Sequence, residues 1–145
     1  MIDGDALHLL DPARLRDRAA PSILTPHAGE FAALFGEGGG SKIDRTLAAA
    51  RTCGATIVFK GADSVVAHPG GQVRVAAARQ PWLASAGTGD VLAGLTGALL
   101  AHHRDPLIAA GDGVWLHSEA ARIAGPAFIA DELAAALPRA LMTPW

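Results

Sequence analysis

The chain has 145 residues, half of them hydrophobic and 18% charged, which suits one folded domain with a substantial core and excludes a disordered chain. Its formal net charge is −2 with both signs mixed, so it lacks the basic stripe of a nucleic-acid-binding protein. The single cysteine, Cys53, excludes an internal disulfide and fits a reducing compartment. The apolar runs are shorter than the ~20 residues of a membrane span, and the N-terminus is acidic from Asp3, so we predict a cytoplasmic protein that does not enter a membrane.

Short strands alternate with helices that open on a capping residue. Asp11 and Asp105 each precede a proline at the first helical position, and Ser41 and Asp131 are the other predicted N-caps. β-Branched and apolar runs predict the strands, two of which form a hairpin around Pro69-Gly70-Gly71. The predicted order is strand 1–2, helix 12–19, strand 22–24, helices 31–35 and 42–53, strands 56–59, 65–67 and 73–77, and helices 90–102, 106–123 and 132–137.

This alternation predicts an α/β layer fold with a largely parallel sheet, in which ligands bind outside the carboxyl ends of the strands. Polar residues follow the predicted strands: Asp3 and Asp5, then His27, Lys60 and the loop at Gly87. We therefore expect them to converge on one edge of the sheet. Two acids around one glycine are weak evidence for a cation site, so no residue is assigned to a metal.

The segment 84–94 is the most informative part of the chain, because small residues are followed by one acid and then by an apolar stretch. Gly87 and Gly89 allow a sharp turn and the close approach of a ligand. The first amides of a helix have no intrahelical partners and favour an anion, and a phosphate there would lie beside the Asp90 carboxylate. This pattern predicts phosphoryl transfer, although it also fits a glycine turn before a helix whose first acid only complements the dipole.

Four segments follow one another in a specific order: 3–7 (Asp-Gly-Asp-Ala-Leu), 25–30 (Thr-Pro-His-Ala-Gly-Glu), 60–61 (Lys-Gly) and 87–94 (Gly-Thr-Gly-Asp-Val-Leu-Ala-Gly). Together they resemble the C-terminal half of the ADP/ATP-dependent NAD(P)H-hydrate dehydratases, which are carbohydrate-kinase-like members of the ribokinase superfamily. The Gly-Thr-Gly-Asp element is shared across that superfamily, whereas the Thr-Pro-His-x-Gly-Glu element joined to it is much more specific.

The resemblance implies a ribokinase-like three-layer α/β/α fold with a mostly parallel sheet, truncated on its N-terminal side, with residues 1–145 as a single domain. It implies the repair of (6S)-NAD(P)H hydrate: a nucleotide phosphorylates the added hydroxyl, and loss of phosphate restores NAD(P)H. ADP, converted to AMP, or ATP is the implied phosphoryl donor, with Mg²⁺ bridging its phosphates. Because full family domains are nearly twice this length, we expect a homo-oligomer or a partner chain that supplies the missing half.

The resemblance also assigns roles to residues. Asp90 is the implied catalytic base and contacts the substrate, as His27 does. The implied anion hole is made by the backbone amides of Gly87, Thr88 and Gly89. The implied nucleotide-binding residues are Lys60, Gly61, Ala62, Asp63, Ser64 and Gly89. On the residues alone, His27 also fits a loop histidine bonded to backbone, and Lys60 fits a solvated lysine at a strand end.

One stretch departs from the family pattern. Arg79-Gln80-Pro81-Trp82 stands where family members carry a stretch like Gly-Asn-Pro-Gly, and Trp82 is bulky enough to crowd a substrate pocket. Two other functions therefore stay open. One is a small-molecule kinase of the same superfamily, of the hydroxymethylpyrimidine or thiazole type. The other is a non-catalytic nucleotide-binding module.

Overall fold

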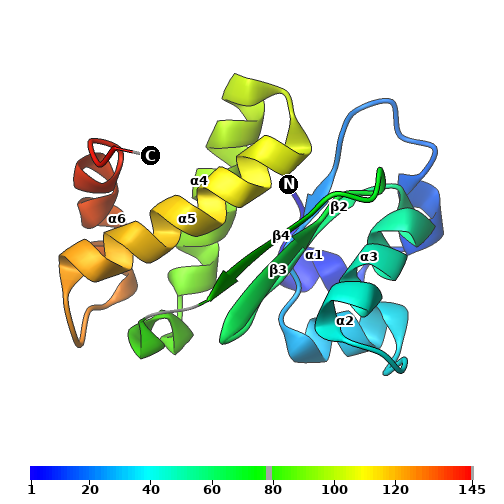
Figure 1. Ribbon diagram of the computed structural model, residues 1–145, viewed down its shortest axis with the longest axis horizontal. Coiled ribbons are helices and arrows are strands. Elements are labelled where there is room, and N and C mark those ends of the chain that lie inside the picture. The colour runs from blue at the N-terminus through cyan, green and yellow to red at the C-terminus, as the bar shows by residue number, and fades with distance from the viewer. Residues whose placement is uncertain (78–79, 145) are drawn as a thin grey trace.

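The computed structural model describes residues 1–77 and 80–144, which form a sheet with helices on both faces (Figure 1). The strands, in the order in which they pair, are β1 (Ile23–Leu24), β2 (Thr56–Phe59), β3 (Asp63–Ala67) and β4 (Val73–Ala77). The helices are α1 (Asp5–His8), α2 (Ala28–Phe35), α3 (Lys42–Cys53), α4 (Thr88–His103), α5 (Pro106–Ala124) and α6 (Ala130–Ala140), with 3₁₀ turns at Pro12–Leu15 and Pro81–Ala84.

The sheet is mixed rather than mostly parallel in the described part of the chain. β1 pairs parallel with β2, and Ile2 adds one parallel bridge to Leu24 on the other side of β1. β2–β3 and β3–β4 are antiparallel, because only three residues join β2 to β3 and a tight turn joins β3 to β4. Parallel pairing is therefore confined to Ile2, β1 and β2.

β2 explains the three layers, because its side chains alternate between the two faces of the sheet. Ile57 and Phe59 belong to the core cluster shared with α1, α2 and α3. Val58 belongs to the opposite cluster, which it shares with α4 and α5. α6 packs on α5 at the far end of the molecule, where Leu116 and Leu133 are fully buried (Figure 1).

The predicted caps are partly confirmed. Ser41 and Asp105 each accept backbone N–H bonds from the first turn of the helix that follows. Asp11 accepts the N–H of Ala13 but caps only a 3₁₀ turn, so the predicted helix 12–19 is wrong. Asp131 is not a cap, since Ile129 precedes α6 and Asp131 lies in its first turn. Of the helices within the described residues, none combines the length and the apolar character required to span a bilayer.

Candidate functional site

Three polar residues, Asp3, Thr25 and Lys60, meet where Ile2, β1 and β2 end, and the sequence predicted this convergence for Asp3 and Lys60. The Thr25 hydroxyl donates to Oδ1 of Asp3 at 2.6 Å, and Nζ of Lys60 lies 3.1 Å from the same oxygen. Lys60 Nζ is also 4.0 Å from Oε2 of Glu30, whose side chain is only 8% exposed. A cation is thus held between two largely buried carboxylates, beside the start of α4.

His27 is the N-cap of α2, which begins three residues earlier than predicted. Its Nδ1 accepts the N–H groups of Gly29 and Glu30, and the Glu30 carboxylate accepts the N–H of His27. The Thr-Pro-His-x-Gly-Glu element is therefore a reciprocally capped helix start. The His27 side chain remains 61% exposed, with its Nε2 3.5 Å from Oε1 of Glu30, and the residue lines the cavity, so a ligand there can reach its ring.

α4 begins at Thr88, two residues before the predicted start, with Gly87 in the left-handed region at a φ of 82°. The Thr88 hydroxyl contacts the carbonyls of Leu83 and Ser85 at 2.7 and 2.8 Å, and the Thr88 N–H donates to Ser85 at 3.4 Å. Throughout the described chain, the N–H groups of Gly89 and Asp90 have no hydrogen-bond acceptor. These two amides are thus free to bind an anion.

A cavity of about 750 Å³ joins these features. Its lining includes seven of the residues assigned by sequence: His27, Lys60, Gly61, Ala62, Ser64, Thr88 and Gly89. Asp63, Gly87 and Asp90 are not among the described residues that line it. Asp90 is exposed, one residue beyond the Gly89 wall. Asp63 instead lies 3.1 Å from Nζ of Lys42, and this hydrogen-bonded cation lowers the pKa of Asp63.

The α5 side of the cavity was not predicted from the sequence. Val114, His117 and Ser118 line it, and their spacing of three to four residues places them on one helical face. His117 is buried, and its Nε2 lies 2.8 Å from the Thr88 carbonyl. Burial lowers the pKa of His117, so the ring is neutral near neutral pH. Helical periodicity in the sequence predicts that these residues share a face of one helix. It does not predict which other element packs against that face.

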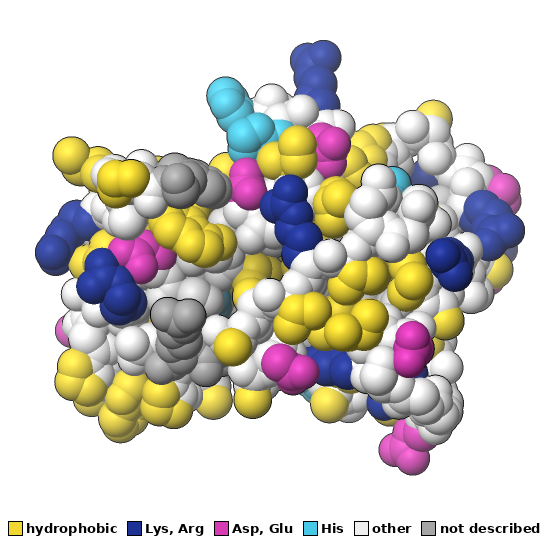
Figure 2. Space-filling view, in the orientation of Figure 1, with side chains coloured by type: hydrophobic (Ala, Val, Ile, Leu, Met, Phe, Trp, Pro, Cys, Tyr) yellow, Lys and Arg dark blue, Asp and Glu magenta, His cyan; other side chains and the backbone are white. Residues whose placement is uncertain are grey.

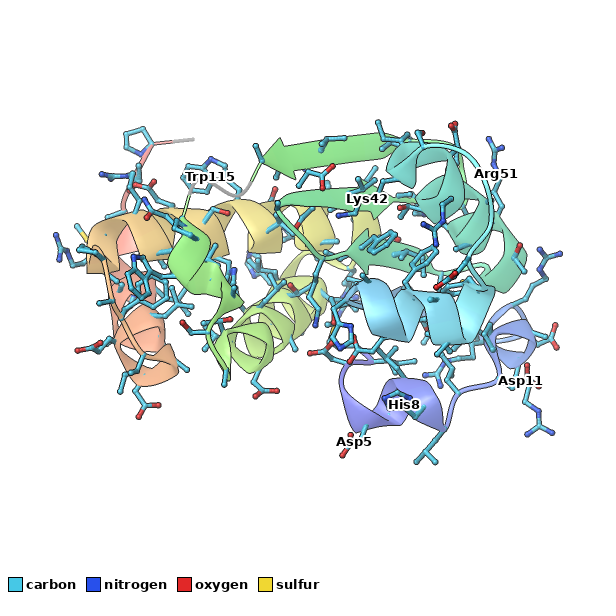
Figure 3. The ribbon with its side chains drawn as sticks, turned by 90° about the horizontal axis from the view of Figure 1, so that it is seen from below. Asp5, His8, Asp11, Lys42, Arg51 and Trp115 are labelled. Carbon is cyan, nitrogen blue, oxygen red and sulfur yellow. The ribbon has the colours of Figure 1, made fainter. Side chains whose placement is uncertain are left out.

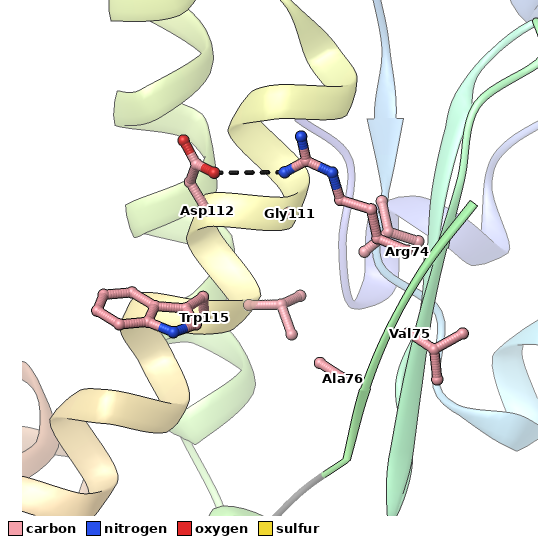
Figure 4. A pocket seen from close by; sticks show the side chains of 8 residues that line it. Arg74, Val75, Ala76, Gly111, Asp112 and Trp115 are labelled. Atoms are coloured by element: carbon pink, nitrogen blue, oxygen red, sulfur yellow. Dashed lines mark hydrogen bonds and ion pairs between the residues drawn. The ribbon is translucent and has the colours of Figure 1, made fainter. Parts of the chain in front are cut away.

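A second hollow of about 330 Å³ lies between β4 and α5 and shares Ala76 and Val114 with the first (Figure 4). Figure 4 shows the Arg74 guanidinium directed at Asp112, 3.4 Å away. Trp82 does not crowd the main cavity: Pro81 and Leu83 on either side of it line the wall, and Trp82 is not among the described lining residues. Arg79, from the same departure, lies outside the described residues.

Asp3 joins the cluster predicted at this edge of the sheet, but Asp5 does not, so the expectation for Asp5 is wrong. Asp3 contacts Lys60, whereas Asp5 points outward from α1 (Figure 3). Over residues 1–77 and 80–144 there is no group of three or more His, Cys, Asp or Glu that could hold a metal. Mg²⁺ bound mainly through phosphates and water needs only one or two carboxylates. Asp3 and Glu30 do not fit even this demand, because both lie against Nζ of Lys60 and neither is among the described residues that line the cavity.

Comparison with known proteins identifies the family. A family model described as NAD(P)H-hydrate dehydratase matches residues 1–141. The bifunctional NAD(P)H-hydrate repair enzyme Nnr of Mycobacterium leprae is 41% identical over 85% of this chain, which spans only 27% of that protein. An ADP/ATP-dependent NAD(P)H-hydrate dehydratase from Bacillus subtilis, co-crystallised with ATP and Mg²⁺, superposes with a TM-score of 0.79 at 33% identity, over 86% of this chain and 48% of that one.

A hydroxyethylthiazole kinase from Pyrococcus horikoshii superposes with a TM-score of 0.69 at 29% identity, over 81% of this chain and 49% of that one. The chain therefore spans about half the length of the solved structures that it matches. The predicted fold class is confirmed: α/β, with ribokinase-like structural neighbours. The match over residues 1–141 and the shared fold show that the chain belongs to the NAD(P)H-hydrate dehydratase family.

Proposed function

We propose that this chain supplies the nucleotide-binding and catalytic part of a dehydratase that converts (6S)-NAD(P)H hydrate back to NAD(P)H. The observation that carries the proposal is the position of Lys60 beside Gly89, whose amide is free, on one cavity. A cation and unpaired N–H groups at a helix start form a site for phosphate. His27 lies on the same cavity and supplies a contact for the hydrate.

The nucleotide phosphates bind between Lys60 and the start of α4. A Cβ built on Gly89 would lie 3.5 Å from Nζ of Lys60, so the two residues are adjacent and one phosphate in the cavity can contact both. Gly61, Ala62 and Ser64 extend this wall. Asp63 and Gly87 act from its margins, Asp63 through Lys42 and Gly87 by setting the turn into α4. ADP or ATP is the donor, and the ATP/Mg²⁺ complex of the Bacillus subtilis relative supports this assignment.

Asp90 acts as the base. It takes the proton of the hydroxyl on the hydrated ring, the oxygen attacks the terminal phosphorus of ADP, and the bond to AMP breaks. Inorganic phosphate then leaves the ring carbon while the ring loses a proton, which restores the double bond. The amides at Gly87, Thr88 and Gly89 form the proposed anion hole, with the Gly89 N–H the best placed, because the Thr88 N–H already contacts Ser85.

Mg²⁺ is part of the proposal as a cation held by the nucleotide phosphates, and the ATP/Mg²⁺ complex of the Bacillus subtilis relative supports it. It would neutralise charge that develops on the transferring group. Asp3 and Glu30 are not assigned to this cation, because Lys60 Nζ already lies within 4.0 Å of a carboxylate oxygen of each residue.

We propose that the dehydration reaction needs a complete domain, in which further chain packs on surfaces that are exposed in residues 1–145. Within the described residues, Ile2 forms a single parallel bridge at its edge of the sheet, and hydrophobic side chains gather at the surface at the end of the molecule where α6 lies (Figure 2). We therefore keep the proposal of a homo-oligomer or of a partner chain that supplies the rest of the fold. Its proposed location is the cytoplasm, where NAD(P)H and adenine nucleotides are present.

A small-molecule kinase is the second candidate, favoured by the superposition on a hydroxyethylthiazole kinase. The two differ in the fate of the phosphate ester, which a kinase releases and a dehydratase eliminates.

The test measures ADP and ATP binding by calorimetry and NADH or NADPH recovery from the hydrate, with the wild type and with Asp90→Asn. The expected result is unchanged nucleotide affinity and a turnover reduced by about 10²–10⁴-fold in the variant. A phosphorylated product without NAD(P)H identifies a kinase. Nucleotide binding with equal activity in both proteins excludes Asp90 as the base. Nucleotide binding without any turnover, by the chain alone and by its oligomer or complex with a partner chain, identifies a non-catalytic binding module.

A further inference from the structure

One peptide group connects the buried histidine to the free amide. The carbonyl of Thr88 and the N–H of Gly89 belong to the same peptide plane and point in opposite directions. Nε2 of His117 lies 2.8 Å from that carbonyl oxygen, and the Gly89 amide lies on the cavity. The orientation of the Gly89 N–H therefore depends on what is bound at the other end of its own peptide group.

The protonation of His117 follows from its partner. A carbonyl oxygen only accepts, so Nε2 must carry the proton and donate it. The residue is 7% exposed, so water does not compete for this bond. His117 and Thr88 are 29 residues apart, and the bond therefore ties α5 to the first residue of α4.

We propose that His117 is a positioning residue whose N–H bond to Thr88 fixes and polarises the Gly89 amide for the phosphate. The inference rests on the proposed function, because it assumes that Gly89 faces a phosphoryl group. Hydrogen bonds in a chain strengthen one another, so donation to the Thr88 carbonyl makes the Gly89 N–H a better donor. The backbone is also held before the ligand arrives, so less order is lost on binding.

The experiment compares two substitutions at His117. His117→Leu introduces an apolar side chain of moderate size and removes the donor, whereas His117→Gln places an amide N–H near the position of Nε2. His102→Leu, at the exposed C-terminal end of α4, is the matched control. The first readout is the ¹⁵N resonance of the Gly89 amide without ligand, identified by its loss in Gly89→Ala. The second is ADP affinity by calorimetry.

We expect His117→Leu to move the Gly89 ¹⁵N resonance upfield and to weaken ADP binding about threefold to tenfold, the value of one hydrogen bond. His117→Gln should restore most of both, and His102→Leu should change neither. An unmoved Gly89 resonance in a folded His117→Leu protein overturns the proposal, as does a Gln variant no better than Leu in both readouts.

The two hypotheses fail separately. If the wild type does not bind ADP, the proposed function fails, while the Gly89 resonance still decides whether His117 positions that amide.

Discussion

The Nζ atom of Lys60 lies 3.1 Å from Oδ1 of Asp3, although the two residues are 57 positions apart in the sequence. This ion pair joins the end of β2 to the end of the bridge at Ile2, with the Thr25 hydroxyl on the same oxygen. Both side chains are largely buried, at 21% and 13% exposed. In the free protein Asp3 and Glu30 hold the lysine that the phosphates are proposed to bind, so ligand and carboxylates compete for one cation.

Lys60→Gln should weaken nucleotide binding by about tenfold or more, since it removes the cation at the phosphate site. It should also lower the free energy of unfolding by about 1–3 kcal/mol, because Asp3 and Glu30 lose their cation while solvent still reaches part of the site. Calorimetric titration with ADP and urea unfolding measure the two effects.

Arg14→Gln is the control for the change in net charge, since the Arg14 side chain is 87% exposed. It should alter the free energy of unfolding by less than about 0.5 kcal/mol and leave ADP affinity unchanged. Equal ADP affinity of Lys60→Gln and the wild type would exclude Lys60 from the phosphate site.

Gly89→Ala should separate stability from binding. The backbone at Gly89 is helical, and a Cβ there meets only Nζ of Lys60 at 3.5 Å, an ordinary contact. Alanine should therefore keep or raise the free energy of unfolding, by up to about 1 kcal/mol. The added methyl group stands where the phosphate approaches, so ADP affinity should fall. Thermal unfolding and ADP titration on the same sample measure both.

Gly94→Ala is the matched variant further along α4, where a Cβ meets nothing within 4 Å. It should stabilise the helix to a similar extent and leave ADP affinity unchanged. If Gly89→Ala and Gly94→Ala bind ADP equally, phosphates do not approach Gly89.

Gly87→Ala should destabilise the fold by about 1–3 kcal/mol for two reasons. Its φ of 82° disfavours a side chain, and a Cβ would lie 2.9 Å from Cβ of Ala130, at the start of α6. The double variant Gly87→Ala/Ala130→Gly removes the second reason, so a double-mutant cycle in urea should give a favourable coupling energy. A coupling energy of zero would show that the α6 contact does not constrain this loop.

The parts of the fold that local chemistry determines could be predicted from the sequence. Thr56–Phe59 is β-branched and apolar because it is buried on both faces, and Ser41 caps α3 with its own hydroxyl. The convergence of Asp3 and Lys60 followed from the rule that parallel strands present their carboxyl ends together. None of these inferences required knowledge of which helices meet.

The starts of three helices were misplaced because each cap is made by an unusual group. His27 caps α2 with a ring nitrogen. At the start of α6 the Glu132 carboxylate accepts the N–H of Ile129, a residue that has no polar side chain of its own. Gly87 caps α4 with backbone geometry and no side chain. The role of His117 depends on α5 crossing the start of α4, a long-range contact that helical spacing does not encode.

His117 should also make stability depend on pH. Burial, and to a lesser degree the charge of Lys60, lower its pKa below 6.5, against the opposing bond to the Thr88 carbonyl. As pH falls below 6.5, the unfolded chain therefore binds a proton that the folded chain resists, and stability is lost at up to about 1.4 kcal/mol per pH unit until the folded-state pKa is reached. Above 6.5 the stabilisation is fully present.

The measurement is urea unfolding of the wild type and of His117→Gln at pH values on both sides of 6.5. The free energy of unfolding of the wild type should fall relative to that of His117→Gln as pH falls, because only the wild type carries this titrating group. The carboxyl of Asp63 does not interfere, since its pKa is lowered from 3.8 and it titrates well below this window. A difference that stays constant across pH 6.5 would mean that His117 titrates alike in both states, so that burial does not hold the ring in its neutral form.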